Sequence, residues 1–232
     1  MTEPIINFSS SIGTLRESSL HSDLKLWYKE SEDQLEAPVE NFIIDIVRAN
    51  LLIEIQTKNF SQIKKKLEKL IANHKILLIH PIVKDKWIIN VESQSNRAIS
   101  KRLSPKHNSY VDIFEELIRI PELISNPNFT IELPLVQIEE YRKNEGNRSW
   151  RRNGWRIYDR KLVKVLEKKA FYTPMDFLML KPTSLKTPFT NKDLAYSLKK
   201  PLNLARKMSY CLRKMGLIKI AGKKGNALIF DY

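Results

Sequence analysis

Residues 42–60 read FIIDIVRANLLIEIQTKNF, and this stretch decides the fold class of the chain. Two apolar runs stand on either side of Ala-Asn, a pattern that predicts two strands joined by a tight turn. Each run holds a carboxylate, Asp45 or Glu54, which is costly to bury without a cation, a hydrogen-bond partner or water. By the two-residue period of a strand, Glu54, Gln56 and Lys58 share one face. The stretch therefore predicts that two carboxylates, an amide and an amine converge at one end of a sheet.

Composition favours a cytoplasmic globular protein. The 232 residues are enough for one or two domains, and a hydrophobic fraction of 42% is ordinary for a globular chain. No apolar run reaches the ~20 residues that cross a bilayer, and the first residues lack the pattern of a signal peptide. The single cysteine, Cys211, excludes a disulfide framework, and its apolar helical surroundings indicate a buried thiol. We expect no membrane partner.

Charge is distributed unevenly along the chain. Residues 1–150 carry 20 Lys and Arg against 21 Asp and Glu, a net of −1, whereas residues 151–232 carry 20 against 5, a net of +15. A segment this basic favours a polyanionic partner, with nucleic acid ahead of an anionic membrane. A solvated surface kept soluble by its charge is the simpler alternative. We expect DNA to be the partner, and a homodimer is left open.

The first part of the chain predicts an α/β domain. Its pattern gives the order helix, three strands, helix and strand, followed by a hairpin, a further helix and a last strand. Ile76–Ile79 is continuously apolar, which is typical of a central strand covered on both faces. The expected ranges are 14–28, 35–39, the two strands within 42–60, 61–73, 76–79, 86–91 with 98–103, 112–120 and 129–138.

Two polar features of these elements have more than one interpretation. Thr14 and Glu17 have capping-box spacing at the start of the first helix, but Glu17 also borders the buried stripe of that helix. It therefore either caps the helix or points into a site beside the sheet. Lys64, Lys65 and Lys66 lie on and around the polar face of the helix over 61–73, as a solvated surface or near a phosphate backbone.

The order of Glu17, Asp45 and Glu54-Ile-Gln56 resembles the catalytic core of the PD-(D/E)XK nuclease superfamily, over about residues 14–83. The resemblance implies a restriction-endonuclease-like mixed sheet flanked by helices. It implies that Asp45 and Glu54 bind Mg²⁺ or Mn²⁺ and that Glu17 orients a metal-bound water. The implied reaction is metal-dependent hydrolysis of a DNA phosphodiester.

Position 56 departs from the pattern of that family, because glutamine stands where the family has lysine. An amide neither acts as a general base nor supplies positive charge. Lys58 lies two residues further along the predicted strand, and its side chain is long enough to reach back toward the carboxylates. The alternative function is a non-catalytic or regulatory DNA-binding protein whose nuclease-like domain is inactive.

The second part of the chain predicts four helices followed by a hairpin with a basic tip. The expected helices cover 159–170, 175–180, 190–198 and 201–215, and two apolar runs flank Gly222-Lys-Lys-Gly-Asn226. Thr190 suits an N-cap, Pro201 a first helical turn and Gly216 a helix end. This order resembles a winged helix-turn-helix over about residues 159–232. The resemblance implies that the last helix enters the major groove and the hairpin touches the backbone, and a winged helix used for protein contacts is the alternative.

The candidate DNA-binding residues are the basic, polar and aromatic side chains of this second part. Trp150 and Trp155, beside two of its arginines, either stack on bases or pack at a domain junction. We expect two domains, a nuclease-like domain over 1–147 and a basic winged-helix domain over 148–232. The candidate set is Arg151, Arg152, Asn203, Arg206, Lys207, Tyr210, Arg213, Lys214, Lys223 and Lys224.

Overall fold

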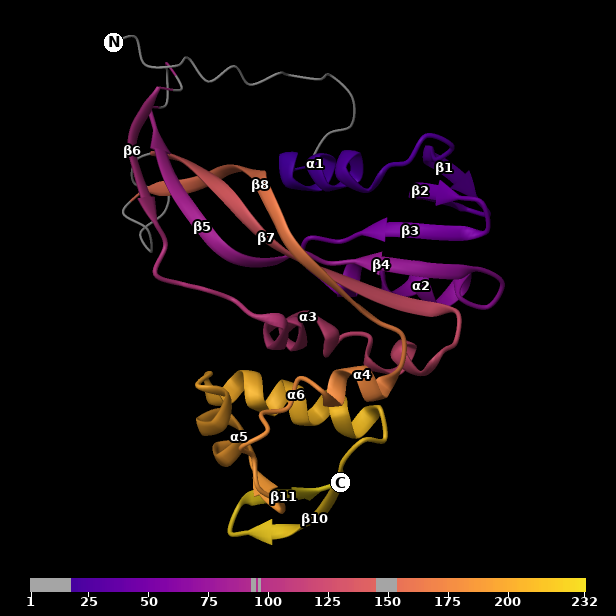
Figure 1. Ribbon diagram of the computed structural model, residues 1–232, viewed down its shortest axis with the longest axis vertical. Helices are drawn as coiled ribbons and strands as arrows, with labels where there is room; N and C mark the ends of the chain where they lie inside the picture. Colours follow the sequence, from indigo (N-terminus) through magenta and orange to yellow (C-terminus); the bar gives the residue numbers. More distant parts are fainter. Residues whose placement is uncertain (1–17, 93–94, 96, 145–153) are drawn as a thin grey trace. The chain divides into compact units, whose positions relative to one another are not determined.

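The fold is mixed α/β, with a large mixed sheet flanked by helices (Figure 1). The computed structural model describes residues 18–92, 95, 97–144 and 154–232. Within these ranges the chain forms two compact units: unit 1 comprises 18–29, 83–108 and 135–167, and unit 2 comprises 30–82, 109–134 and 168–232. This division differs from the expected boundary at 147/148, because strands β7 (Phe129–Asn144) and β8 (Trp155–Phe171) each contribute residues to both units.

Unit 2 contains the strands predicted from residues 42–60. Its sheet order is β1-β2-β3-β4-β7, antiparallel from β1 to β3 and parallel from β3 through β4 to the start of β7. A parallel pair needs a crossover, and the helix between β3 and β4 supplies it. Ile53 and Leu78 are fully buried, as expected for central strands. The bounds are β1 (Gln34–Val39), β2 (Phe42–Arg48), β3 (Leu51–Ile55), η1 (Phe60–Gln62), α2 (Lys64–Leu70) and β4 (Lys75–Ile79).

The expected helix over 112–120 is built from three short helical turns. A capping box between Ser109 and Asp112 starts the first of them, and Pro121 starts the last. The fully buried residues Ile113, Phe114 and Leu117 anchor the segment in unit 2. Its bounds are η2 (Tyr110–Ile113), α3 (Phe114–Leu117) and η3 (Pro121–Ser125).

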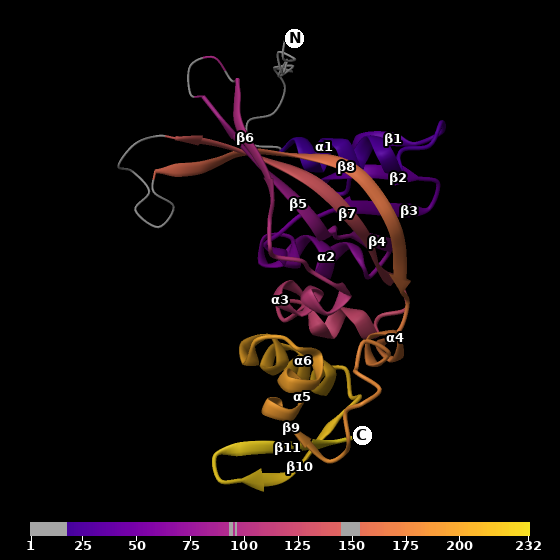
Figure 2. The ribbon, with the colours of Figure 1, turned by 60° about the vertical axis from the view of Figure 1, so that its left-hand side comes forward.

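The end of unit 2 is a small module of helices and a three-stranded sheet, ordered β10-β11-β9 (Figure 2). Thr190 forms the predicted cap, with a capping box to Asp193. Gly216 ends the last helix at a φ of +73°, a conformation that favours glycine. Cys211 is buried as predicted, and burial raises the pKa of its thiol to about 12. The bounds are α4 (Pro174–Leu178), β9 (Phe189–Thr190), α5 (Asn191–Leu198), α6 (Leu202–Lys214), β10 (Lys219–Lys224) and β11 (Ala227–Asp231).

The helix predicted over 159–170 is wrong, because these residues belong to the 17-residue strand β8, which pairs with β7. The spacing of Leu162 and Leu166 matched a helical turn, but pairing with a neighbouring strand overrode this short local signal. Asp159, the first residue of that range, accepts hydrogen bonds from the hydroxyl and backbone N–H of Ser19, at 2.5 and 3.2 Å.

Unit 1 comprises helix α1 (Ser19–Tyr28), strands β5 (Ile82–Val91, from Val83) and β6 (Ala98–Leu103), and parts of β7 and β8. The β5–β6 hairpin confirms the predicted one. Glu140, on β7, is fully buried and lies 2.6–3.0 Å from three cations, those of Lys86, Arg142 and Arg160. Burial opposes ionisation of this carboxyl, but the three cations hold its pKa down at about 2. Across the described ranges, no helix combines the length and apolar character that crossing a membrane requires.

Candidate functional site

The two carboxylates of the 42–60 stretch lie on the same face of the unit 2 sheet. Strands β2 and β3 are antiparallel with Ile46 opposite Ile53, a register that brings Asp45 opposite Glu54. Directly opposed residues of antiparallel strands share one face. Asp45 Oδ2 also accepts a hydrogen bond from the backbone N–H of Ile55 at 2.8 Å. The strand alternation thus places both acids together.

The cation beside Glu54 comes from helix α2 rather than from β3. Lys66 Nζ lies 2.5 Å from Glu54 Oε1 and also donates to the backbone carbonyl of Ile43. The two side chains are only 17% and 7% exposed, so the ion pair is nearly withdrawn from water. Among the described residues, Oε1 finds no well-aligned hydrogen-bond donor, so the charge of Lys66 is what compensates it.

Sequence reasoning placed Lys66 in a solvated or phosphate-facing run and missed this role. A signal was present in the helical spacing. Lys66 lies three residues after Ile63 and four before Leu70, so it borders the buried stripe of α2, whereas Lys65 does not. A lysine at the border of a buried stripe can extend along the apolar surface to a carboxylate.

Glu54 is tuned to titrate near neutral pH. Burial raises its pKa to about 7, the nearby Asp45 carboxylate acts in the same direction, and Lys66 opposes both. A carboxyl with such a pKa exchanges a proton in the physiological range, which an ordinary surface glutamate does not.

The strand face predicted to carry Glu54, Gln56 and Lys58 stops short of Lys58. The backbone N–H of Gln56 still donates to the carbonyl of Ile79 at 2.9 Å, so the pairing with β4 extends to Gln56. Strand β3 ends at Ile55, and the chain then turns through Asn59, whose φ is +65°. Gln56 Nε2 donates to the carbonyl of Lys58 at 2.5 Å, and this local hydrogen bond accompanies the turn. Lys58 is exposed beyond the strand, and Lys66 takes the place beside Glu54 that was expected for it.

A buried histidine holds the chain directly after β3. His80 Nδ1–H donates to the carbonyl of Gln56 at 2.6 Å, and its ring packs edge-on against Phe60 at 4.9 Å. Burial lowers the pKa of His80, so the ring is neutral when it makes this bond. His80 thus supports the backbone that follows Glu54. Glu17, Arg151 and Arg152 lie outside the described residues.

Helix α6 has one basic face that is already paired within unit 2. Lys207 and Lys214, on this face, contact Glu115 of α3 and Glu122 of η3, the latter at 3.3 Å. Lys200, two residues before the helix begins, contacts Asp112 of η2 at 2.6 Å. Lys207 and Lys214 were expected to face DNA and are instead partly neutralised by these carboxylates. The sequence contains the acids, but nothing local indicates that they meet α6.

The other polar face of α6 is an exposed stripe, which we call the α6 stripe: Asn203, Arg206, Tyr210 and Arg213. Its three- and four-residue spacing keeps these side chains on one side of the helix. Within the described ranges neither arginine has a carboxylate partner. Lys223 and Lys224 are exposed at the end of β10, beside Gly225, whose φ is +59°. Each of these was a predicted contact residue.

A metal site would have few protein ligands here. In the part of the chain that the structure describes, no group of three or more His, Cys, Asp or Glu side chains is placed to hold a metal ion. Residues 42–60 offer two carboxylates, Asp45 and Glu54, on one face of the sheet. Mg²⁺ is commonly held by one or two carboxylates together with substrate phosphate and water, so this donor pair fits that ion.

These features define an α/β protein with a carboxylate–lysine site on its sheet and a basic helix-and-hairpin module at its end. The chain belongs to the family described as Domain of unknown function (DUF8091), whose model matches residues 18–172. The module from α4 to β11 follows that segment.

The chain is also similar to a protein of Treponema pallidum (strain Nichols), described as an uncharacterized protein. The two are 26% identical over 161 residues, which is 69% of this chain and 64% of the relative, so this chain spans slightly less than two thirds of the relative's length. No solved structure matches the chain.

Proposed function

We propose that the protein binds duplex DNA through the module from α4 to β11, with α6 in the major groove and the β10–β11 tip on the phosphate backbone. The observation that carries the proposal is the division of α6 into a neutralised face and the exposed α6 stripe. The order helix, strand, two helices and two strands, with a three-stranded sheet, supports a winged helix-turn-helix in this module.

The chemistry of the α6 stripe suits a groove of DNA. Arginine pairs in a bidentate manner with guanine and asparagine with adenine, while a tyrosine hydroxyl is a common phosphate partner. Helix α6 has 13 residues, a length of about 20 Å at 1.5 Å per residue. The stripe from Asn203 to Arg213 therefore extends about 15 Å along a groove. A cytoplasmic location is part of the same proposal.

Salt dependence tests the proposal. Among the predicted contact residues, the exposed cations without a carboxylate partner in the described ranges are Arg206, Arg213, Lys223 and Lys224. If all four contact DNA, the slope of log affinity against log salt is about −3 to −4, and affinity falls about 100-fold between roughly 50 and 200 mM salt. Fluorescence anisotropy with a labelled duplex measures both. A slope near zero, or no duplex binding at low salt, would contradict the proposal.

A second candidate function is hydrolysis of a DNA phosphodiester at the carboxylate–lysine site. It is favoured by the same-face placement of Asp45 and Glu54 and by the ammonium of Lys66 at 2.5 Å from Glu54. These observations support a restriction-endonuclease-like arrangement in which Lys66 supplies the positive charge expected at position 56. Asp45 and Glu54 would hold Mg²⁺ or Mn²⁺, which when bound stabilises the charge that develops on the phosphate.

The residues of the chain would contribute position and proton exchange to this reaction. The Ile55 N–H fixes one oxygen of Asp45 at 2.8 Å. Glu54, with a pKa of about 7, takes up or releases a proton near neutral pH. Lys66 places a positive charge 2.5 Å from Glu54.

Asp45→Asn is expected to abolish cleavage, with a loss of at least about 100-fold, because the amide keeps the shape of the side chain but removes the anionic ligand. The measurement is cleavage of plasmid, linear, branched and single-stranded DNA with Mg²⁺ or Mn²⁺. Glu68→Gln, on the exposed face of α2, is the matched control and should cleave like wild type. If wild type cuts none of these substrates, the hydrolytic candidate fails and DNA binding alone stands.

A further inference from the structure

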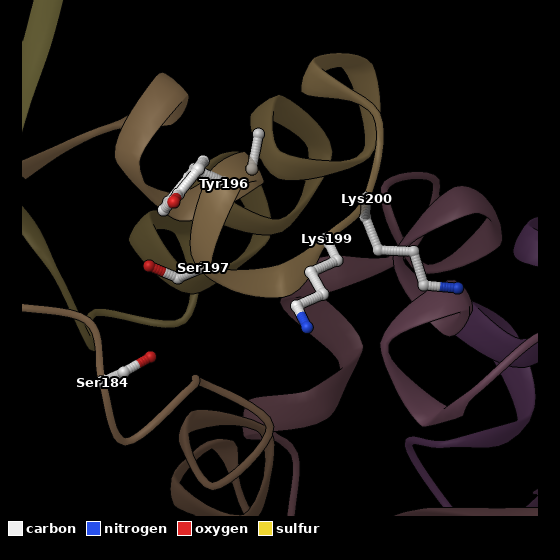
Figure 3. Close-up of a pocket in the computed structure, with 6 residues that line it drawn as sticks. Ser184, Tyr196, Ser197, Lys199 and Lys200 are labelled. Carbon is white, nitrogen blue, oxygen red and sulfur yellow. The ribbon is translucent and has the colours of Figure 1, made fainter.

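A cavity of about 630 Å³ lies in unit 2 beside the end of helix α5 (Figure 3). In Figure 3 the hydroxyls of Ser184 and Ser197 and the ammonium of Lys199 border the same hollow, while Lys200 extends away from it. Among the residues that the structure describes, no acidic side chain lines the cavity. Its lining is Ser184, Ala195, Tyr196, Ser197, Lys199 and Lys200.

Lys199 is held in an unusual backbone conformation at this cavity. It ends α5 with a φ of +52°, in the left-handed region where glycine is the preferred residue. Its N–H donates to the carbonyl of Tyr196 and the N–H of Lys200 donates to that of Ala195, both at 3.1 Å. These bonds occupy two of the free carbonyls at the negative end of the helix, so they reduce its repulsion of an anion. A strained residue that persists where glycine fits better is a reason to look for a function.

The charge that faces the cavity belongs to Lys199. The ammonium of Lys200 is paired with Asp112 at 2.6 Å, so this residue lines the cavity with its carbon stem. In the described part of the chain, the side chains of Ser184, Ser197 and Lys199 have no protein hydrogen-bond partner. Ser184 and Lys199 are exposed and Ser197 is half-buried, so water satisfies these three donors until a ligand replaces it, and one net positive charge faces the open volume.

We propose that this cavity binds a phosphate group, with the Lys199 ammonium and the hydroxyls of Ser184 and Ser197 donating to its oxygens. Charge-assisted hydrogen bonds of this kind are the strong ones at phosphate sites. The phosphate belongs either to the backbone of a bound duplex, which rests on the proposed DNA-binding function, or to a free nucleotide, which does not. The volume is within the range of small-molecule sites, about 300–1,000 Å³.

Lys199→Gly is the sharpest test, because glycine relieves the backbone strain while it removes the charge. Its thermal stability should equal or exceed that of wild type, so a loss of binding is not a loss of fold. Lys199→Arg should retain binding, and Ser184→Ala/Ser197→Ala should weaken it. Lys186→Gly, at an exposed lysine that does not line the cavity, is the matched control.

Two sets of probes distinguish the sources of phosphate. Calorimetry with inorganic pyrophosphate and with AMP reports the free-nucleotide source, and anisotropy with a labelled duplex reports the backbone source. Lys199→Gly is expected to weaken binding of the probe that wild type binds by about tenfold. If that probe is the duplex, the slope of log affinity against log salt also becomes less steep by about 1.

The outcomes separate this site from the DNA-binding proposal. One outcome is that duplex affinity falls in Arg206→Ala/Arg213→Ala but stays unchanged in Lys199→Gly, with no binding of pyrophosphate or AMP. That outcome contradicts the proposed phosphate site and leaves the DNA-binding proposal standing. Loss of pyrophosphate or AMP binding in Lys199→Gly supports the cavity even if wild type binds no duplex. If wild type binds none of the three probes, both proposals fail.

Discussion

Replacing Arg206 and Arg213 together by alanine is expected to weaken duplex binding by about 100-fold, because each arginine that contacts DNA contributes about 1–3 kcal/mol. Both side chains lie on the exposed α6 stripe without a carboxylate partner among the described residues, so their full charge faces outward. The slope of log affinity against log salt should become less steep by up to about 2, because each phosphate that the variant no longer neutralises reduces it by about 1. Anisotropy titrations at several salt concentrations measure both quantities.

Lys207→Ala/Lys214→Ala is the matched control for that variant. It removes the same charge from the same helix, but from the face that pairs with Glu115 and Glu122. Because those lysines are engaged within unit 2, duplex affinity should change by less than about fivefold. A change of this size comes from the weaker long-range attraction between the protein and DNA. An equal loss in both double variants would show that net charge, and not the α6 stripe, controls binding. That result would contradict the proposal that α6 lies in the major groove.

Lys66→Met is expected to destabilise the protein by about 1–1.5 kcal/mol more at about pH 8 than at about pH 5. At about pH 8 the nearly buried Glu54, whose pKa is about 7, is ionised and loses its cation, whereas at about pH 5 it is protonated and needs no counter-charge. Urea denaturation at the two pH values measures the difference. Lys65→Met, at the exposed neighbour on α2, should change stability by less than about 0.5 kcal/mol at either pH.

The wild-type pH dependence has the same origin. The pKa of Glu54 is about 7 in the folded chain, above its ordinary value of 4.5. Folding therefore favours the protonated form, and this stabilisation is fully present below about pH 4.5 and is lost as pH rises through about 7. The loss amounts to about 3 kcal/mol. Glu140 acts in the opposite sense, but only below about pH 4.5, since its pKa is lowered to about 2.

A double variant completes this test. Glu54→Gln/Lys66→Met removes both charges, so its stability should no longer fall as pH rises through about 7; the remaining change is a loss below about pH 6.5 from the buried neutral His80. It should also recover most of the stability that Lys66→Met loses at the higher pH. If Lys66→Met is equally stable at both pH values, Glu54 is not controlled by the Lys66 charge.

Local signals predicted most elements of the fold. The alternation in residues 42–60 predicted β2 and β3 and put Asp45 and Glu54 on one side of a sheet, because strand periodicity depends only on neighbouring residues. Caps and glycine predicted α5, α6 and the final hairpin for the same reason. Where a short pattern conflicted with strand pairing, as at Leu162 and Leu166, the pattern predicted the wrong element.

The sequence by itself determined the α/β class, the two acids of the site, the buried Cys211 and the basic character of the last module. Only the tertiary structure decided that Lys66, and not Lys58, stands beside Glu54, and that Lys207 pairs with an acid while Arg206 faces outward. The physical reason is the range of the interactions. A cap or a strand face depends on a few adjacent residues, whereas a charge pair depends on which distant elements pack together.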